Sequence, residues 1–147
     1  MKRLCIVLFM FIGCFIGSYA QKPLFNHLAI CVTDLKKSTS FYKDVIGLDT
    51  IANPFNDKKH VWFSIGGSNE LHIIAGAAPA AAHPQDNHLC FRVSSVEDFI
   101  QRLRKAGVSY ENARGKKDEI TVRPDGVKQI YFTDPDGYWI EVNDVQK

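Results

Sequence analysis

Residues 26–32 read NHLAICV and residues 87–93 read NHLCFRV, so one short pattern occurs twice, about sixty residues apart. In each stretch apolar residues alternate with others, which is the pattern of a strand with one buried face. A histidine opens each copy, His27 in the first and His88 in the second. The alternation places both histidines on the face opposite the apolar side chains. The repetition predicts that the chain is built from two similar units.

The same order of elements continues after each predicted strand. In the first half, one of residues 33–34 (Thr-Asp) can cap a helix that stops at Gly47. In the second half, Ser94 and Glu97 form a capping box before an apolar stripe at helical spacing, which ends at Gly107. We therefore expect one helix in each half.

A hairpin is predicted to complete each half. The first joins HVWFSI (60–65) to ELHII (70–74), and the second joins KQIYFT (128–133) to YWIEVN (138–143) through the turn DPDG (134–137). Each half is thus a βαβββ module, at about residues 24–78 and 85–145, and the fold class is α+β. Because neither module can bury its helix and sheet face alone, we expect two curved mixed sheets around a shared cavity, which would hold the functional site.

The first twenty residues have a different composition. A basic pair precedes an apolar run over residues 4–16, and small residues end at Ala20, which is the order of a secretory signal. The run is shorter than the roughly 20 residues that span a bilayer. We expect a signal peptide over residues 1–20, an exported (periplasmic or secreted) single domain over residues 21–147, and no stable membrane insertion. The alternative is a lipoprotein anchored at Cys14.

Length and charge exclude some classes of function. The chain has 147 residues, which suits one domain, and a formal net charge of +2. Its basic residues are scattered and form no stripe that could neutralise a row of phosphates. Nucleic acid is therefore not expected as a partner.

Three potential metal ligands are predicted to lie on faces that no helix covers. Glu141 lies between Ile140 and Val142 in its predicted strand, so its side chain points away from their apolar face, as His27 and His88 do. Two imidazoles and a carboxylate suit one divalent ion with open coordination positions, such as Zn, Ni, Mn or Fe(II). We expect the three side chains to converge on that ion in the shared cavity. The same trio is the ligand set of an Fe(II) oxygenase, so ligand types alone do not identify the metal.

These segments resemble the vicinal-oxygen-chelate superfamily, which includes glyoxalase I, bleomycin-resistance proteins and extradiol dioxygenases. The resemblance covers residues 25–144, and its most specific part is GVKQIYFTDPDGYWIEV (126–142), in which a glutamate follows the DPDG turn. It implies that His27, His88 and Glu141 are the first, third and fourth metal ligands. It also implies a homodimer.

The second ligand has two candidates on one face of the same strand. By resemblance to glyoxalase I, Glu70 in ELH takes this place. The internal repeat favours His72 instead, because His72 follows Phe63 at the same spacing at which Glu141 follows Phe132. One of the two residues would bind the metal while the other acts as a base.

Further side chains are predicted to face the cavity. Those proposed to contact substrate are His60, Trp62, Arg92, Gln129 and Tyr131. Arg92 can hold an anionic substrate group or form an ion pair at the rim. Cys31 and Cys90 are expected to remain thiols, because nothing in the sequence brings their sulfurs together.

The resemblance implies a lactoylglutathione lyase-like enzyme. Such a metal-dependent lyase or isomerase would act on a small hydroxy-carbonyl substrate through a metal-stabilised enediolate, with Glu141 or Glu70 moving the proton. One alternative is an Fe(II) oxygenase of the same fold. The other is a non-catalytic protein that binds a small molecule of the antibiotic type.

Overall fold

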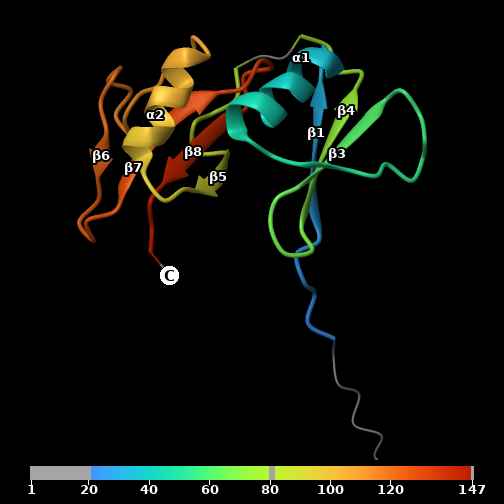
Figure 1. Cartoon of the computed structure of the whole chain (residues 1–147), viewed down its shortest axis with the longest axis horizontal. Helices are drawn as coiled ribbons and strands as arrows, with labels where there is room; N and C mark the ends of the chain where they lie inside the picture. Colours follow the sequence, from blue (N-terminus) through green and yellow to red (C-terminus); the bar gives the residue numbers. More distant parts are fainter. Residues whose placement is uncertain (1–20, 80–81, 147) are drawn as a thin grey trace, which may run out of the picture.

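The computed structural model describes residues 21–79 and 82–146, and it contains two four-stranded mixed sheets (Figure 1). The elements in chain order are β1 (His27–Val32), α1 (Leu35–Ser40), η1 (Phe41–Ile46), β2 (Thr50–Ile51), β3 (His60–Ser64), β4 (Glu70–Ala75), β5 (His88–Arg92), α2 (Val96–Lys105), β6 (Thr121–Val122), β7 (Lys128–Thr133) and β8 (Trp139–Asn143). The α+β class and the two-sheet architecture are confirmed. The predicted signal peptide and its alternative anchor Cys14 lie outside the described residues.

The two sheets have the same topology. Strand order is β1-β4-β3-β2 in the first sheet and β5-β8-β7-β6 in the second. In each, the opening strand runs parallel to the last strand of its module, and that last strand pairs antiparallel with the strand before it. The two short strands β2 and β6, which the sequence pattern did not locate, are the outer edge strands of the two sheets. The internal repeat therefore extends to the strand pairing.

The first helix is extended by a wider helical segment. Asp34 caps α1 through its side chain, which accepts a hydrogen bond from the Lys37 backbone N–H at 3.0 Å. The chain then continues as the π-helical segment η1 and ends at Gly47, whose φ of 88° suits a residue without Cβ. η1 carries Phe41 and Tyr42 into the core, where both are buried. The predicted helix end is confirmed, whereas no feature of the sequence pattern indicated the π-helical segment.

The cap of the second helix differs from the prediction. Ser95, not Ser94, is the N-cap of α2, and its hydroxyl accepts a hydrogen bond from the backbone N–H of Asp98 at 3.1 Å. Ser95 has the extended backbone of a cap residue, with φ −150° and ψ 120°, so the helix begins one residue later than a cap at Ser94 requires. The predicted end at Gly107 is confirmed.

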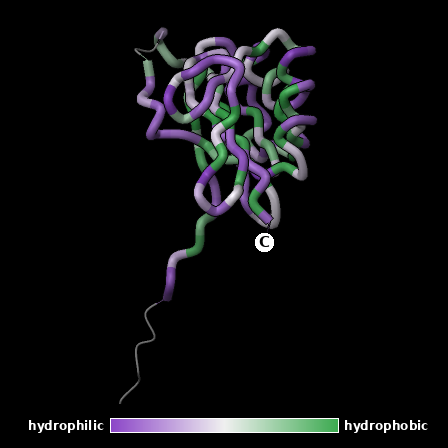
Figure 2. The backbone as a smooth tube through the Cα atoms, turned by 90° about the vertical axis from the view of Figure 1, so that its left-hand side faces the viewer, coloured by the Kyte–Doolittle hydropathy of each residue, from purple (hydrophilic) through white to green (hydrophobic). Residues whose placement is uncertain are grey.

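The apolar faces of both sheets pack into one core. That core includes Ile30, Phe63 and Ile73 from the first sheet, Ile130, Phe132 and Ile140 from the second, and Phe41, Phe99 and Leu103 from the helices. The ring of Phe41 lies 6.4 Å from that of Phe132, so the first helical segment contacts the second sheet. Figure 1 shows α1 between the two sheets, and Figure 2 shows the alternation of hydrophobic and hydrophilic residues along the chain.

This shared core determines where the other sheet faces point. Because the helix-covered sides of both sheets pack into the same core, their opposite sides point away from each other. His27 and Cys31 of β1 are exposed, as are His88 and Cys90 of β5. In the part of the chain that the structure describes, the predicted cavity between the two sheets therefore does not form.

The DPDG turn joins the two modules. Asp136 accepts hydrogen bonds from the backbone N–H and the hydroxyl of Thr33, both at 2.7 Å, and from the hydroxyl of Ser38 at 2.8 Å. Asp134 accepts a buried hydrogen bond from the Tyr42 hydroxyl at 2.9 Å. Tyr138, directly after the turn, donates to the backbone oxygen of Cys31 at 3.1 Å. The turn therefore fixes the first helix against the second hairpin.

No helix among the described residues combines the length and apolarity needed to cross a membrane.

Candidate metal centre

The predicted ligands form two groups, one on each sheet. The first group, here called the N half-site, comprises His27, Glu70, His72 and Trp62. The second, the C half-site, comprises His88, Glu141, Tyr131, Cys90, Asn143 and Gln129. Both lie on sheet faces that no helix of the described residues covers.

The N half-site is a column of stacked rings. The imidazole of His72 lies 4.4 Å from that of His27 at 14°, and 3.8 Å from the Trp62 ring at 11°. Because β4 lies between β1 and β3, His27 and Trp62 contact opposite faces of the His72 ring. The Nε2 of His72 is 2.8 Å from an oxygen of Glu70.

The C half-site is a hydrogen-bond network centred on Glu141. One oxygen of this carboxylate accepts hydrogen bonds from the Tyr131 hydroxyl at 2.5 Å and lies 3.3 Å from Nε2 of His88. The other accepts from the Asn143 amide at 2.7 Å and from the Cys90 thiol at 3.4 Å. Glu141 is only 7% exposed, so each of these partners replaces a lost contact with water.

The network controls the charge of its members. Burial raises the pKa of Glu141, but hydrogen bonds from Tyr131, Asn143 and Cys90 lower it by more, so that the pKa falls below its ordinary value. Burial, together with the adjacent carboxylate, raises the pKa of Cys90 to about 12 and raises that of Tyr131 well above its usual value. At neutral pH Glu141 is therefore an anion with neutral donors around it.

His27 and His88, which open β1 and β5, each use Nδ1 in a hydrogen bond and leave Nε2 available to a ligand. Nδ1 of His88 donates to the backbone oxygen of Gln85 at 2.9 Å, and Nδ1 of His27 donates to the side-chain oxygen of Asn26 at 2.7 Å. With Nδ1 protonated in this way, Nε2 of a neutral imidazole carries the lone pair. This is the state in which a histidine binds a metal, and a partner on the other nitrogen is the usual support for such a ligand.

The strand register distinguishes His72 from Glu70. Across β4 and β3, His72 pairs with Trp62, just as Glu141 pairs with Tyr131 across β8 and β7. Glu70, in contrast, is the partner of His27 on β1, a place that Trp139 takes beside His88. His72 is thus the structural equivalent of Glu141. Glu70 forms a hydrogen bond with the His72 ring, as a carboxylate that does not itself bind the metal often does with a ligand histidine.

One chain does not complete the predicted site. In residues 21–79 and 82–146, no three His, Cys, Asp or Glu side chains lie in an arrangement that could hold a metal ion. The convergence of His27, His88 and Glu141 in one chain is therefore not observed. The physical reason is the common core, which turns the two ligand-bearing faces away from each other.

The other predicted side chains divide between the half-sites. Trp62 and Tyr131 contact His72 and Glu141 directly, and the Gln129 amide donates to the Tyr131 hydroxyl at 2.9 Å. His60 is on the Trp62 face of β3 but bonds to Asp57 at 2.8 Å. Arg92 is exposed on the same face as His88. Cys31 and Cys90 are free thiols.

Some partners in this arrangement were not singled out from the sequence. Each predicted ligand has a hydrogen-bond partner of this kind: His27 bonds to Asn26, His88 to Gln85, and Glu141 to Asn143. Asn143 shares the face of Glu141 by alternation, so its place was predictable. The dipeptide Asn-His occurs in both halves, but only Asn26 uses its side chain, since the contact to His88 comes from a backbone oxygen that no pattern indicates.

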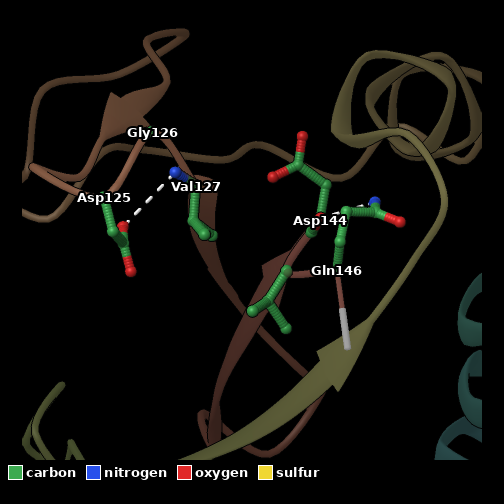
Figure 3. Close-up of a pocket in the computed structure, with 6 residues that line it drawn as sticks. Asp125, Gly126, Val127, Asp144 and Gln146 are labelled. Carbon is green, nitrogen blue, oxygen red and sulfur yellow. Dashed lines mark hydrogen bonds between the residues drawn. The ribbon is translucent and has the colours of Figure 1, made fainter.

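A hollow of about 430 Å³ lies elsewhere on the second module. Its lining is Asp125, Gly126, Val127, Asp144, Val145 and Gln146, between the β6–β7 turn and the chain after β8 (Figure 3). No predicted site residue lines it. The half-sites are therefore separate from this hollow.

Comparison with known proteins shows the family of this chain. The family model described as Glyoxalase/Bleomycin resistance protein/Dioxygenase superfamily matches residues 24–142. The chain belongs to this superfamily. Among its curated members, the Arabidopsis thaliana protein Glyoxylase I 4 is 27% identical over 123 residues, which cover 80% of this chain and 68% of that protein. The metallothiol transferase FosB of Shouchella clausii is 31% identical over 121 residues, covering 80% and 77% of the two chains.

The fold of the superfamily is also found in solved structures. Oxidase ChaP-H2 superposes with a TM-score of 0.70 at 23% identity, covering 86% of this chain and 96% of that one. This likeness concerns the fold alone. The resemblance inferred from the sequence is confirmed, and so is the two-sheet architecture that places the ligand-type residues.

Proposed function

We propose that this glyoxalase-superfamily protein is a divalent-metal-dependent lyase or isomerase whose site is completed between two copies of the chain. The observation that carries the proposal is the pair of half-sites, each with two potential metal ligands on an uncovered sheet face. His27 and His72 of one copy and His88 and Glu141 of the other would hold the ion. Three nitrogen donors and a carboxylate suit Zn, Ni, Mn or Fe(II).

The need for a second copy follows from ligand number. Catalytic metal sites in proteins commonly use three protein ligands and keep one position open. Each half-site alone provides two. Two copies related by a twofold axis would place the N half-site of each against the C half-site of the other, which makes two equivalent sites. Within the described part of the chain, β1 and β5 each pair on one side only, so both sheets have an edge available for this contact.

Bound there, a divalent ion would supply a Lewis acid that stabilises negative charge on neighbouring oxygens of a hydroxy-carbonyl substrate. The chain itself would supply the proton transfer. Glu141 is anionic and held still by its hydrogen bonds, whereas Glu70 has His72 as its partner and is more exposed. Either carboxylate would take a proton from a carbon next to the carbonyl and return it to the adjacent position.

Substrate binding would use side chains at the rim of each half-site. The exposed guanidinium of Arg92 lies on the strand face that carries His88, where it would bind an anionic group of the substrate. His60 and Trp62 line the opposite half-site, and Trp62 offers an apolar ring face. Gln129 and Tyr131 would border the same space from β7.

The test is turnover by the metal-loaded protein. We expect it to convert a hemithioacetal of a 2-oxoaldehyde, or to exchange the carbon-bound proton of a hydroxy-ketone with solvent deuterium, and to lose this activity on chelation. Glu141→Gln keeps the side-chain size and should abolish the activity. Metal-loaded wild-type protein that catalyses neither reaction would exclude the lyase and isomerase proposal.

The principal alternative is an Fe(II) oxygenase. His27, His88 and Glu141 form the two-histidine, one-carboxylate set that such enzymes use. Oxygen uptake with bound iron, and none with zinc or nickel, would favour it over proton transfer. A protein that binds no metal under either condition would instead support non-catalytic binding of a small molecule.

We further propose that the chain is exported. The basic pair, the apolar run and the small residues before Gln21 support cleavage after Ala20. N-terminal sequencing of the protein from an exported fraction should begin at Gln21, whereas a lipid-modified start at Cys14 would indicate the lipoprotein alternative.

A further inference from the structure

Two aromatic side chains occupy equivalent positions beside the two buried ligand-type residues. Trp62 on β3 is the cross-strand partner of His72 on β4, and Tyr131 on β7 is the cross-strand partner of Glu141 on β8. His72 and Glu141 are themselves only 8% and 7% exposed, so the orientation of their side chains is set by neighbouring side chains rather than by water. The repeat thus places one aromatic ring beside each buried ligand-type side chain.

We propose that Trp62 and Tyr131 are positioning residues, each of which fixes the orientation of the metal ligand on the neighbouring strand. Trp62 does so by stacking on the His72 imidazole, and Tyr131 does so by donating a hydrogen bond to the Glu141 carboxylate. The inference rests on the proposed function, because it takes His72 and Glu141 as ligands. It gives both aromatic residues a role beyond contact with substrate.

The stacking geometry on β3 and β4 supports the role of Trp62. The two rings lie 3.8 Å apart and within 11° of parallel, so rotation of the imidazole about χ2 would push it into the indole. The ring of Phe55 in turn meets Trp62 nearly edge-on, at 5.9 Å and 79°. Among the described residues the indole N–H has no hydrogen-bond partner, so Trp62 holds His72 through its ring face alone.

The hydrogen bonds on β7 and β8 support the role of Tyr131. Its hydroxyl donates to Glu141 at 2.5 Å and accepts from the Gln129 amide at 2.9 Å, which leaves it one direction in which to donate. The terminal torsion of a glutamate is broad when no partner restricts it. Tyr131 together with Asn143 therefore selects one orientation of the carboxylate.

The different contacts match the chemistry of the two ligands. A neutral imidazole has two flat faces, and stacking restricts its plane without occupying the nitrogen that would bind metal. A carboxylate has four lone-pair sites, and a hydroxyl donor uses one while leaving others for the ion. The same strand position thus supports two ligand types through two different side chains.

The experiment is a Co²⁺ titration of the full chain, followed by the visible absorption of bound Co²⁺ and by its dissociation constant. Tyr131→Phe removes one hydroxyl, and Trp62→Leu removes the flat ring. We expect each to weaken Co²⁺ binding about 10- to 100-fold, the range for loss of a partner behind a ligand, and to shift the absorption bands. Trp62→Phe keeps a ring face and should restore most of the affinity.

Controls separate positioning from general damage. Tyr110→Phe removes a hydroxyl that donates to the backbone oxygen of Asp118 and not to a residue of either half-site, and should leave affinity and spectrum unchanged. Circular dichroism of each metal-free variant checks folding, and Trp62→Met repeats the test with another apolar side chain if Trp62→Leu does not fold.

Two results would overturn the inference, and they differ. In the first, Tyr131→Phe and the Trp62 variants keep wild-type affinity and spectrum while His88→Ala loses binding. That result would support the metal site and contradict the positioning roles. If wild type and His88→Ala bind Co²⁺ equally weakly, then the proposed metal site fails, and the positioning roles fail with it.

Discussion

The two half-sites occupy equivalent strands of a repeated module but are held by different forces. In the N half-site, stacked rings order the side chains, and one carboxylate lies at the edge of the column. In the C half-site, a buried carboxylate is surrounded by hydrogen-bond donors. The comparison teaches that the backbone of the module determines where a ligand residue lies. Its cross-strand partner on the neighbouring strand determines how strongly the orientation of the ligand side chain is restricted. The predictions below test this difference from the largest expected effect to the smallest.

The largest effect should come from the two candidates for the second ligand. His72→Ala removes a ligand and should weaken metal binding more than about 100-fold, whereas Glu70→Ala removes an outer partner and should weaken it about tenfold. Isothermal titration with Zn²⁺ measures both. The reverse order would make Glu70 the ligand and His72 its support.

The turns of the two hairpins should differ strongly in their effect on stability. Asp136 accepts three hydrogen bonds from the first module, so Asp136→Ala should lower the free energy of unfolding by about 2–3 kcal/mol. Ser68 lies in the corresponding turn of the first hairpin, which has a backbone bond between Asn69 and Gly66. Ser68→Ala should change stability by less than about 0.5 kcal/mol. Urea unfolding curves compare the two, and similar losses would refute the role of the DPDG turn as the junction.

The same junction should be sensitive to acid. Burial raises the pKa of Asp136, but the hydrogen bonds from Thr33 and Ser38 lower it more, so it falls below its ordinary value of 3.8. A carboxyl group whose folded pKa is depressed stabilises the fold above its unfolded pKa and loses that contribution as the pH falls through the folded value. Stability should therefore decline below about pH 4, and Asp136→Asn should make this part of the profile flatter. A variant whose acid-limb slope equals that of wild type would show that Asp136 contributes nothing there.

The smallest effect concerns the helix caps. Ser95→Ala should cost about 1 kcal/mol of stability, since it removes the hydroxyl that accepts from Asp98, whereas Ser94→Ala should cost little. Thermal unfolding of both variants distinguishes the observed cap from the predicted one. A larger loss for Ser94→Ala would contradict the position of the cap.

Much of this fold was predictable because the same sequence pattern occurs in both modules and specifies the same elements in each. Alternation placed His27, His88 and Glu141 on the faces that no helix covers, and glycines marked the ends of both helices. The equal spacing from Phe63 to His72 and from Phe132 to Glu141 matches the observed strand register. These features depend on local periods and on turn residues, which a sequence shows directly.

The relation between the modules was not predictable in the same way. How the two sheets are oriented relative to each other depends on how the helices of one module pack against the other, and this is decided by contacts such as Phe41 with Phe132 and Tyr42 with Asp134. Those residues are far apart in the sequence, and the repeat contains no information about them. The expectation of a cavity within one chain failed for this reason.

The most direct test of the account is to mix two variants that each lack one half-site. His27→Ala damages the N half-site and His88→Ala the C half-site, so neither alone should bind metal or turn over substrate. After the two are unfolded and refolded together, half of a random mixture is mixed dimers with one intact site each, so about a quarter of the wild-type metal content and activity should return. If the mixture stays as inactive and as metal-free as its components, then the site is not shared between two chains and the account is contradicted.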